Sequence, residues 1–349
     1  MKFKSIFVTG GAGYIGASLV PYLLEKGHKV SIYDIMFFGD QFLPKNNPNL
    51  KVINGDIRDS EKIELCSRDH DAFVNLACIS NDSSFELDKK LSKSINYDAF
   101  EPMVVASKKA GRKRFIHAST SSVYGVSKET NVKEDHALVP LTLYNKYKAL
   151  TEPFLLKHAD TNFECVIIRP ATVCGYSPRQ RLDLSVNILT NFAVNKSEIK
   201  VFGGDQLRPN LHIKDYCECI KLLLESDVEK IQRQIYNVGY QNMSINEIAQ
   251  LVKKVVLREF KEKKEIKIIK TESEDNRSYH INSDKIKNIL GFEPKRSIEM
   301  AVKDLCKAFK EGLIPNSFEN DSYFNVKRLK TIRAAWEKSN SYRRRWFYR

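Results

Sequence analysis

The chain has 349 residues, of which 42% are hydrophobic and 29% charged, and its formal net charge is +14. This length allows one large or two medium domains, and no apolar run is long enough to predict an integral membrane segment. Seven scattered cysteines lack the spacing of a disulfide framework or a zinc site, so we expect reduced thiols, a cytoplasmic location and no metal.

The positive charge is compatible with nucleic acid, an anionic membrane or a phosphorylated small molecule as partner. Much of the excess falls between Lys327 and Arg349, and no aromatic and basic platform or recognition helix precedes it. We therefore expect a basic C-terminal tail over 316–349 and no nucleic-acid binding.

In the first half of the chain, β-rich apolar runs alternate with helical periodicity. Strands are expected at 3–9, 29–34, 51–54, 72–75, 114–118 and 163–169, and helices at 14–26, 99–110 and 144–158. This alternation predicts a parallel sheet covered by helices on both faces. The tight strand-to-helix turn at the first glycines favours an α/β doubly wound (Rossmann) domain over residues 1–175.

After Gly175 the alternation becomes irregular. Helices are expected at 183–195, 244–256 and 283–290, and strands at 200–203, 211–213 and 266–269. We expect a smaller mixed α/β domain over 176–315, above the carboxyl edge of the sheet, with parts of the later segments returning to the first domain.

The motif Gly10-Gly11-Ala12-Gly13-Tyr14-Ile15-Gly16 follows a strand and opens a helix. Gly10 permits the tight turn, Gly13 lets the backbone approach a pyrophosphate, and Gly16 allows close helix packing. The phosphates would then lie at the positive end of the helix. The motif predicts a dinucleotide pocket.

Asp34 ends the second expected strand. A carboxylate at this point can accept hydrogen bonds from both hydroxyls of the adenosine ribose and would repel a 2′-phosphate, and no arginine follows closely. We therefore predict NAD rather than NADP. Asp56 and Ile57, after the third strand, are weaker candidates for contact with the adenine.

Tyr144 and Lys148 lie one turn apart on an expected helix, so they share a face. A lysine ammonium beside a tyrosine favours the phenolate, which can take a proton from a substrate hydroxyl while hydride leaves the same carbon. Thr120, after the fifth strand, supplies a hydroxyl to hold the substrate oxygen. An ordinary pair on a helix surface is the structural alternative, but the order of motifs favours a nicotinamide enzyme.

Together these motifs resemble the extended short-chain dehydrogenase/reductase family, in its group of nucleotide-sugar epimerases and dehydratases. The matching segments lie at 9–16, 55–59, 75–78, 119–125, 144–148, 169–175, 208–215 and 290–294. The resemblance implies that the first domain binds NAD, that the second binds a nucleoside-diphosphate sugar, and that the protein is a homodimer.

The resemblance also implies roles for single residues. It makes Thr120, Tyr144 and Lys148 catalytic. The expected cofactor-binding residues are Gly10, Gly13, Tyr14, Ile15, Gly16, Asp34, Asp56, Ile57, Leu76, Ala77, Asn96, Tyr144 and Lys148. The expected substrate-binding residues are Thr120, Ser121, Ser122, Asn187, Arg208 and Arg277, with the arginines pairing to the substrate diphosphate.

The chain departs from the family pattern at several positions, among them Asn75, Thr172 and Cys174, and two further departures bear on its activity. Sugar 4,6-dehydratases of the family carry Thr-Asp-Glu where this chain has Thr120-Ser121-Ser122, so the acids that help to eliminate water are missing. The basic insert over 177–183 either holds a phosphate or sugar, or is a structural loop.

The sequence thus predicts an NAD-dependent enzyme acting on a nucleoside-diphosphate sugar through a 4-keto intermediate, with 4-epimerase the favoured activity. A 4-dehydrogenase or reductase with tightly bound NAD(H) stays open. So does, in another class, a non-catalytic NAD-binding scaffold or regulator, although that protein would have no need of the Tyr144 and Lys148 pair.

Overall fold

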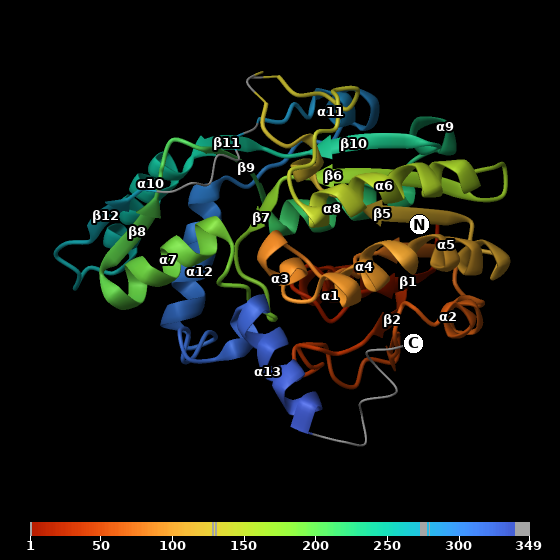
Figure 1. Cartoon of the computed structure of the whole chain (residues 1–349), viewed down its shortest axis with the longest axis horizontal. Coiled ribbons are helices and arrows are strands. Elements are labelled where there is room, and N and C mark those ends of the chain that lie inside the picture. Colours follow the sequence, from red (N-terminus) through yellow and green to blue (C-terminus); the bar gives the residue numbers. More distant parts are fainter. Residues whose placement is uncertain (1, 128, 130, 273–277, 279, 339–349) are drawn as a thin grey trace.

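The computed structural model describes residues 2–127, 129, 131–272, 278 and 280–338. The largest feature within them is a parallel seven-stranded sheet in the order β10-β6-β5-β4-β1-β2-β3 (Figure 1). Its strands are β1 (Ser5–Thr9), β2 (Lys29–Asp34), β3 (Leu50–Asn54), β4 (Ala72–Asn75), β5 (Arg114–Ala118), β6 (Glu164–Pro170) and β10 (Gln234–Val238). The predicted doubly wound sheet is confirmed.

Helices cover both faces of this sheet because alternate side chains of each strand point to opposite sides. Ile6 and Val8 of β1 pack toward α1 (Gly16–Glu25) and α8 (Ile213–Glu225). Phe7, between them, packs toward the other face, which is covered by α2 (Ser60–Ser67), α5 (Phe100–Lys109) and α6 (Leu143–His158). Strands β1, β2, β4, β5 and β6 are accordingly buried along almost their whole length.

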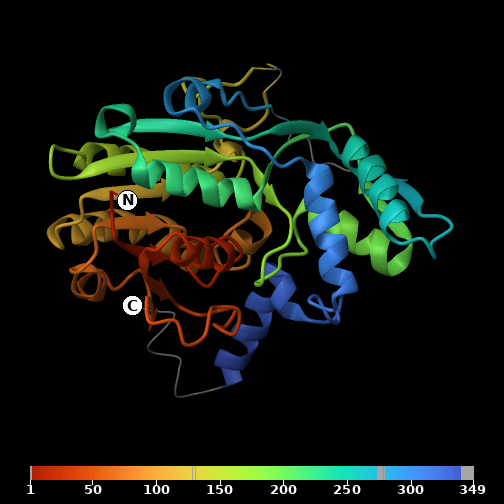
Figure 2. The ribbon, with the colours of Figure 1, turned by 180° about the vertical axis from the view of Figure 1, so that it is seen from behind.

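A smaller lobe lies beyond the carboxyl ends of the strands (Figure 2). It contains a mixed sheet of β11 (Gln241–Ser244), β9 (Leu207–His212) and β7 (Thr172–Cys174), and a parallel pair of β12 (Lys267–Thr271) and β8 (Glu198–Phe202). Three helices, α7 (Ser185–Lys196), α10 (Ile245–Glu259) and α12 (Ile298–Lys310), share one apolar cluster with these strands. The predicted mixed α/β lobe is present.

The chain passes between the lobes more than once. Both α8 and β10 lie in the first lobe, so later segments do return to it. Of the strand expected at 211–213, residues 211 and 212 belong to β9, whereas Ile213 begins α8. The His212 side chain caps this helix by accepting a hydrogen bond from the Lys214 N–H (3.1 Å). Short helices complete the connections: α3 (Asp82–Glu86), α4 (Lys89–Lys93), α9 (Val228–Ile231), α11 (Asp284–Leu290), the π-helix η1 (Ser94–Asp98) and the 3-10 helices η2 (Ser121–Tyr124) and η3 (Asp321–Tyr323).

The segment expected to be a basic tail begins as folded structure. Helix α13 (Asn325–Lys338) lies across the lower edge of the molecule between the two lobes (Figure 1). Leu329 and Ile332 pack against the apolar cluster of the first lobe, and the Arg328 guanidinium donates to the Phe37 carbonyl (2.8 Å). The apolar positions hidden among its basic residues attach this helix to the sheet domain.

A buried ion pair joins α6 to the sheet. Arg169 of β6 meets the Glu152 carboxylate of α6 through two nitrogens, at 2.6 and 3.0 Å, and both side chains are almost fully buried. The Ser119 hydroxyl donates to the same carboxylate (2.6 Å), and Arg169 also donates to the Tyr124 hydroxyl (2.7 Å). The pair therefore fixes α6 relative to the ends of β5 and β6.

Removing one partner should leave a buried charge unpaired. We expect Glu152→Ala to lower the free energy of unfolding by about 3–5 kcal/mol, measured by urea denaturation. The control is Glu101→Ala, which breaks the more exposed contacts of Glu101 with Lys157 and His158 and should cost about 1 kcal/mol or less. Equal losses in the two variants would contradict the role given to the buried pair.

Candidate active site

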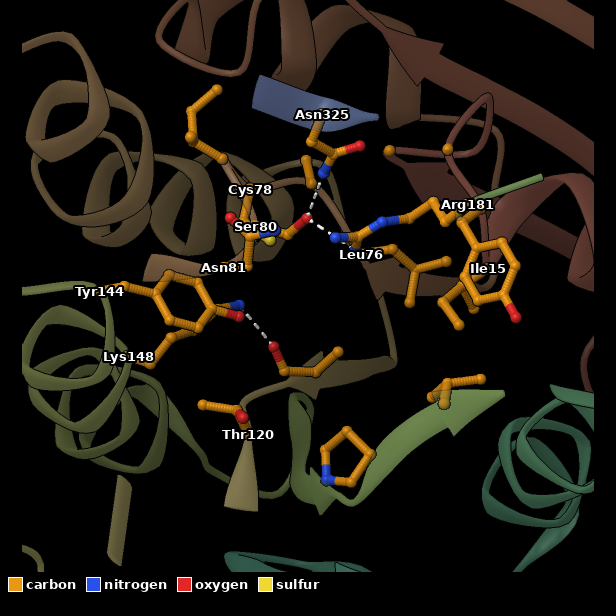
Figure 3. A pocket seen from close by; sticks show the side chains of 18 of the residues that line it. Ile15, Leu76, Cys78, Ser80, Asn81, Thr120, Tyr144, Lys148, Arg181 and Asn325 are labelled. Carbon is orange, nitrogen blue, oxygen red and sulfur yellow. Dashed lines mark hydrogen bonds between the residues drawn. The ribbon is translucent and has the colours of Figure 1, made fainter. Parts of the chain in front are cut away.

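A deep cavity opens where the carboxyl ends of the parallel strands meet the smaller lobe (Figure 3). Its walls come from the glycine turn, the ends of β2, β4, β5 and β6, the first turns of α6, the 177–183 insert and α13. Among the residues that line it are Gly10, Gly13, Tyr14, Ile15, Asp34, Asp56, Ile57, Leu76, Ala77, Thr120, Ser121, Ser122, Tyr144, Lys148 and Arg208. Ligands bind at this edge of doubly wound sheets because the loops diverge there.

The glycine turn has the geometry that its sequence predicts. Gly10 has φ of +74°, and a Cβ there would lie 2.6 Å from the Ala77 nitrogen, so a side chain is excluded. A Cβ on Gly16 would lie 2.3 Å from the Gly11 carbonyl oxygen. Gly13 lines the cavity, and α1 starts directly behind it, so the positive end of this helix faces the space that a diphosphate would fill.

Asp34 closes β2 beside this turn. Its carboxylate accepts hydrogen bonds from the Ala12 N–H (3.0 Å) and the Met36 N–H (2.8 Å). Burial raises the pKa of this carboxyl, and the backbone donors act in the opposite direction. An oriented carboxylate next to a phosphate-binding turn fits the ribose of NAD, so the residues present suit this cofactor.

The three expected catalytic side chains reach the same cavity. Tyr144 and Lys148 project into it from α6, and Thr120 approaches from the end of β5 (Figure 3). The Lys148 ammonium is buried and donates to the Ala118 carbonyl (2.7 Å), which fixes its position at the end of β5. The Thr142 hydroxyl caps α6 by accepting from the Asn145 N–H (3.3 Å), so the helix begins at the point that presents Tyr144.

A chain of hydroxyl groups orients Thr120. Its hydroxyl oxygen lies 2.8 Å from that of Ser122, and the Ser122 hydroxyl donates to the Asn145 side-chain oxygen (2.6 Å). Thr120 also accepts a hydrogen bond from the Ser122 N–H (3.2 Å) at the start of η2. This network connects the end of β5 to α6, so Thr120 and Tyr144 are held relative to each other.

Two of the expected ligand-binding residues, Asn96 and Asn187, are not among those that line the cavity. Asn96 uses its side chain to bond both the N–H and the carbonyl of Ile79 (2.8 and 2.9 Å), inside η1 and away from the cavity. Asn187 is fully buried and bonds the Gly175 N–H and the Arg181 carbonyl (3.0 and 2.9 Å). Both amides are occupied by backbone groups, so they shape the loops around the cavity.

For other predicted residues the structure shows the position, and their ligand contacts stay predictions. Arg208 lines the cavity from β9, where it can meet an anionic substrate group. The Asp56 carboxylate lines it too but binds the Arg58 guanidinium, with Nε 3.0 Å from each oxygen. Arg277 lies outside the described residues.

The structure adds side chains that the motifs did not assign. Arg179 and Arg181 of the basic insert, Ser80 after β4 and Asn325 at the start of α13 all line the cavity. The insert's charge was a signal for the arginines. Nothing in the sequence pointed to Asn325, because only folding brings the C-terminal helix to the strand ends.

Membrane-spanning helices and metal-binding clusters were both considered for the described part of the chain. No helix there is both long and apolar enough to cross a membrane. No three His, Cys, Asp or Glu side chains there are grouped so that they could hold a metal ion.

Comparisons with known proteins show the family of the chain. The model of the NAD dependent epimerase/dehydratase family matches residues 6–239. A UDP-N-acetyl-alpha-D-glucosaminuronate decarboxylase of Bacillus cytotoxicus is 27% identical over 327 residues, covering 88% of this chain and 98% of that protein.

Two solved structures are similarly alike. The UDP-glucose 4-epimerase of Thermotoga maritima with UDP-glucose has a TM-score of 0.78 and 26% identity. The UDP-glucuronic acid 4-epimerase of Bacillus cereus, in complex with UDP-glucuronic acid and NAD, has a TM-score of 0.77 and 26% identity. Each comparison covers 88% of this chain and 99% of the other.

The chain belongs to the NAD dependent epimerase/dehydratase family. It is an NAD-dependent enzyme of the extended short-chain dehydrogenase/reductase type, in a family that acts on nucleotide sugars by epimerisation, dehydration or decarboxylation.

If Asp34 binds the ribose hydroxyls, its removal should weaken NAD selectively. We expect Asp34→Ala to reduce NAD affinity roughly ten- to hundredfold, the loss of a charge-assisted hydrogen bond, and to affect NADP much less. Titration of both dinucleotides by calorimetry measures the ratio. Asp205→Ala, which removes an exposed carboxylate in the smaller lobe, is the control. An unchanged NAD/NADP preference would rule out the ribose contact.

Proposed function

We propose that this enzyme interconverts epimers of a nucleoside-diphosphate sugar at C4, through a 4-keto intermediate. The observation that carries the proposal is convergence: Thr120, Tyr144 and Lys148 line the same cavity as the glycine turn and Asp34. A sugar hydroxyl in that cavity can lose its proton to the phenol and its hydride to the nicotinamide in one place.

The residues then have separate tasks. Bound NAD supplies a reversible acceptor for hydride. Tyr144 takes the proton of the C4 hydroxyl and returns it in the reverse step, and Lys148 supplies positive charge beside the phenolate. Thr120 places its hydroxyl beside the reacting oxygen, at a position set by its contact with Ser122 and, through Ser122, with Asn145.

The carboxylates of the cavity favour epimerisation over dehydration. Those lining the described part of the cavity are Asp34, Asp56 and Asp82. Each has a hydrogen-bond partner: Asp34 takes backbone N–H groups, Asp56 takes Arg58, and Asp82 accepts from the Thr142 hydroxyl (2.5 Å). Elimination of water requires an acid and a base beside the sugar ring, and Ser121 and Ser122 supply neither.

Uridine diphosphate sugars are the first substrates to test. Arg208 offers a guanidinium to a substrate diphosphate. The two similar epimerase structures hold UDP-glucose and UDP-glucuronic acid. We propose the same class here, with the nucleotide held in the smaller lobe.

Product analysis separates this activity from its alternatives. An epimerase converts the sugar and leaves NAD oxidised after each turnover. A 4-dehydrogenase accumulates NADH and a ketone, a decarboxylase releases carbon dioxide from UDP-glucuronic acid, and a scaffold converts nothing. Incubation of the purified protein with UDP-glucose and UDP-glucuronic acid, followed by mass spectrometry, sugar analysis and NADH absorbance, distinguishes all four. Only epimer formation supports the proposal.

Loss of the phenolic hydroxyl should remove the base. We expect Tyr144→Phe to lower kcat about 10²- to 10⁴-fold, the usual contribution of general acid–base catalysis, with NAD content unchanged. Tyr147→Phe is the matched control, because Tyr147 lies on the same helix and packs against Phe85 and Tyr97 instead. Near-normal turnover by Tyr144→Phe would refute the assigned base.

A further inference from the structure

The basic insert is fastened to the glycine turn. The Ser177 hydroxyl donates to the Tyr14 carbonyl (2.7 Å), and the Tyr14 hydroxyl donates to the Gly175 carbonyl (2.7 Å). These bonds join the start of α1 to the loop that leaves β7. The insert therefore lies against the glycine turn, and Arg179 and Arg181 line the same cavity as Gly10 and Gly13.

Two arginines of the insert are buried there with donors to spare. Arg179 is 1% and Arg181 8% exposed, and both line the cavity. Arg179 donates to the Asn325 side-chain oxygen (2.7 Å), and Arg181 donates to Asp183 (2.9 Å) and to Ser80 (3.1 Å). Nε of Arg179 and Nη2 of Arg181 are buried without a hydrogen-bond partner. A buried donor without a hydrogen-bond partner lowers the stability of the fold unless a bound ligand accepts a hydrogen bond from it.

The local charge is also incomplete. Asp183 pairs with Arg181, and Asp34 is the other carboxylate that acts on Arg179. Burial, and then repulsion from Arg181, lowers the pKa of Arg179 to about 9. Only one of the two buried guanidinium groups, Arg181, forms an ion pair with a carboxylate among the described residues, and this favours an anion between them.

Their neighbours show where that anion would lie. The Arg179 guanidinium lies over the Phe38 ring, 3.6 Å from its centroid, in the loop that follows β2, which places it on the Asp34 side of the glycine turn. Arg181 donates to Ser80, which Figure 3 shows on the same side of the cavity as Tyr144. In Figure 3, Arg181 extends across the cavity wall toward Ser80, near Ile15 and Leu76. A dinucleotide that runs from Asp34 to Tyr144 passes its diphosphate between these two points.

We propose that Arg179 and Arg181 form a clamp for the NAD diphosphate, facing the positive end of α1 from the opposite side. The clamp rests on NAD use but not on the identity of the sugar. Each guanidinium offers its unpaired donor to a phosphoryl oxygen, so the diphosphate is held between helix dipole and arginines. The negative charge of the diphosphate then balances the positive charge of the two guanidinium groups.

Helix α13 positions the clamp. The Asn325 side chain accepts from Arg179 and donates to the Ser80 hydroxyl (3.0 Å), while its N–H donates to Asp183 (3.0 Å). Asn325 therefore contacts Arg179 directly, and it also contacts Ser80 and Asp183, the two residues to which Arg181 donates. Retention of the cofactor depends on a helix far along the chain from the glycine motif.

The test uses the purified holoenzyme. NAD per chain is counted after denaturation, and release of bound NAD is followed by exchange into excess isotope-labelled NAD. We expect Arg181→Gln and Arg179→Gln to release NAD roughly ten- to hundredfold faster, and Asn325→Ala to shift release in the same direction. Arg181→Lys, which keeps the charge, should lie between wild type and Arg181→Gln. Lys254→Gln, an exposed change of equal charge, is the control.

Competition by fragments identifies the group that is held. ADP carries a diphosphate and adenosine does not, so ADP should displace NAD less well from Arg181→Gln than from wild type, while adenosine competes equally. NAD release at the wild-type rate would overturn the clamp. So would an equal loss for adenosine, or weaker binding of UDP with NAD release unchanged, which would assign the arginines to the substrate diphosphate. None of these readouts requires a sugar to be turned over, so failure of the clamp and failure of the proposed epimerisation remain distinct.

Discussion

The buried pair of Glu152 and Arg169 connects the sheet to the chemistry. Through Ser119 and Tyr124 it binds the end of β5, the catalytic helix α6 and the end of β6 into one unit. Thr120 follows Ser119, and Tyr144 and Lys148 precede Glu152 on the same helix. General acid–base catalysis depends on reach, and a displacement of α6 by an ångström would separate phenol from substrate oxygen. This ion pair is therefore a condition of the site's geometry even though it touches no ligand.

Electrostatics divides the cavity into two regions. Near the glycine turn, the α1 dipole and two arginines create positive potential, with the Asp34 carboxylate at the end of β2 beside them. Near α6, the single ammonium of Lys148 is held against the Ala118 carbonyl, beside neutral hydroxyl groups. The first region suits a permanent anion, and the second suits a charge that appears only while the substrate is oxidised.

The sequence was enough to predict the elements and turns whose conformation depends on neighbouring residues. Strand β2, β4 and β5 were predicted with their observed bounds, and the glycine turn has the positive φ that Gly10 implies. It was insufficient where distant segments meet. Asn96 and Asn187 stay predicted ligand residues, and the structure shows their amides bonded to nearby backbone groups, which the sequence did not indicate. Asn325 could not be assigned because its partners, Arg179 and Ser80, lie in loops that the fold brings to it.

The placement of α13 follows from the same competition. Its basic composition suggested a solvated tail, yet Leu329 and Ile332 bury apolar surface on the sheet domain. Lys327, Lys330 and Arg333 stay exposed, so the helix docks without removing these charges from water. Once docked, the helix presents the Asn325 side chain to Arg179 and the Asn325 N–H to Asp183. A burial event at the end of the chain thus orders polar groups beside its beginning, and the dinucleotide site becomes a property of the whole fold and not of the first domain alone.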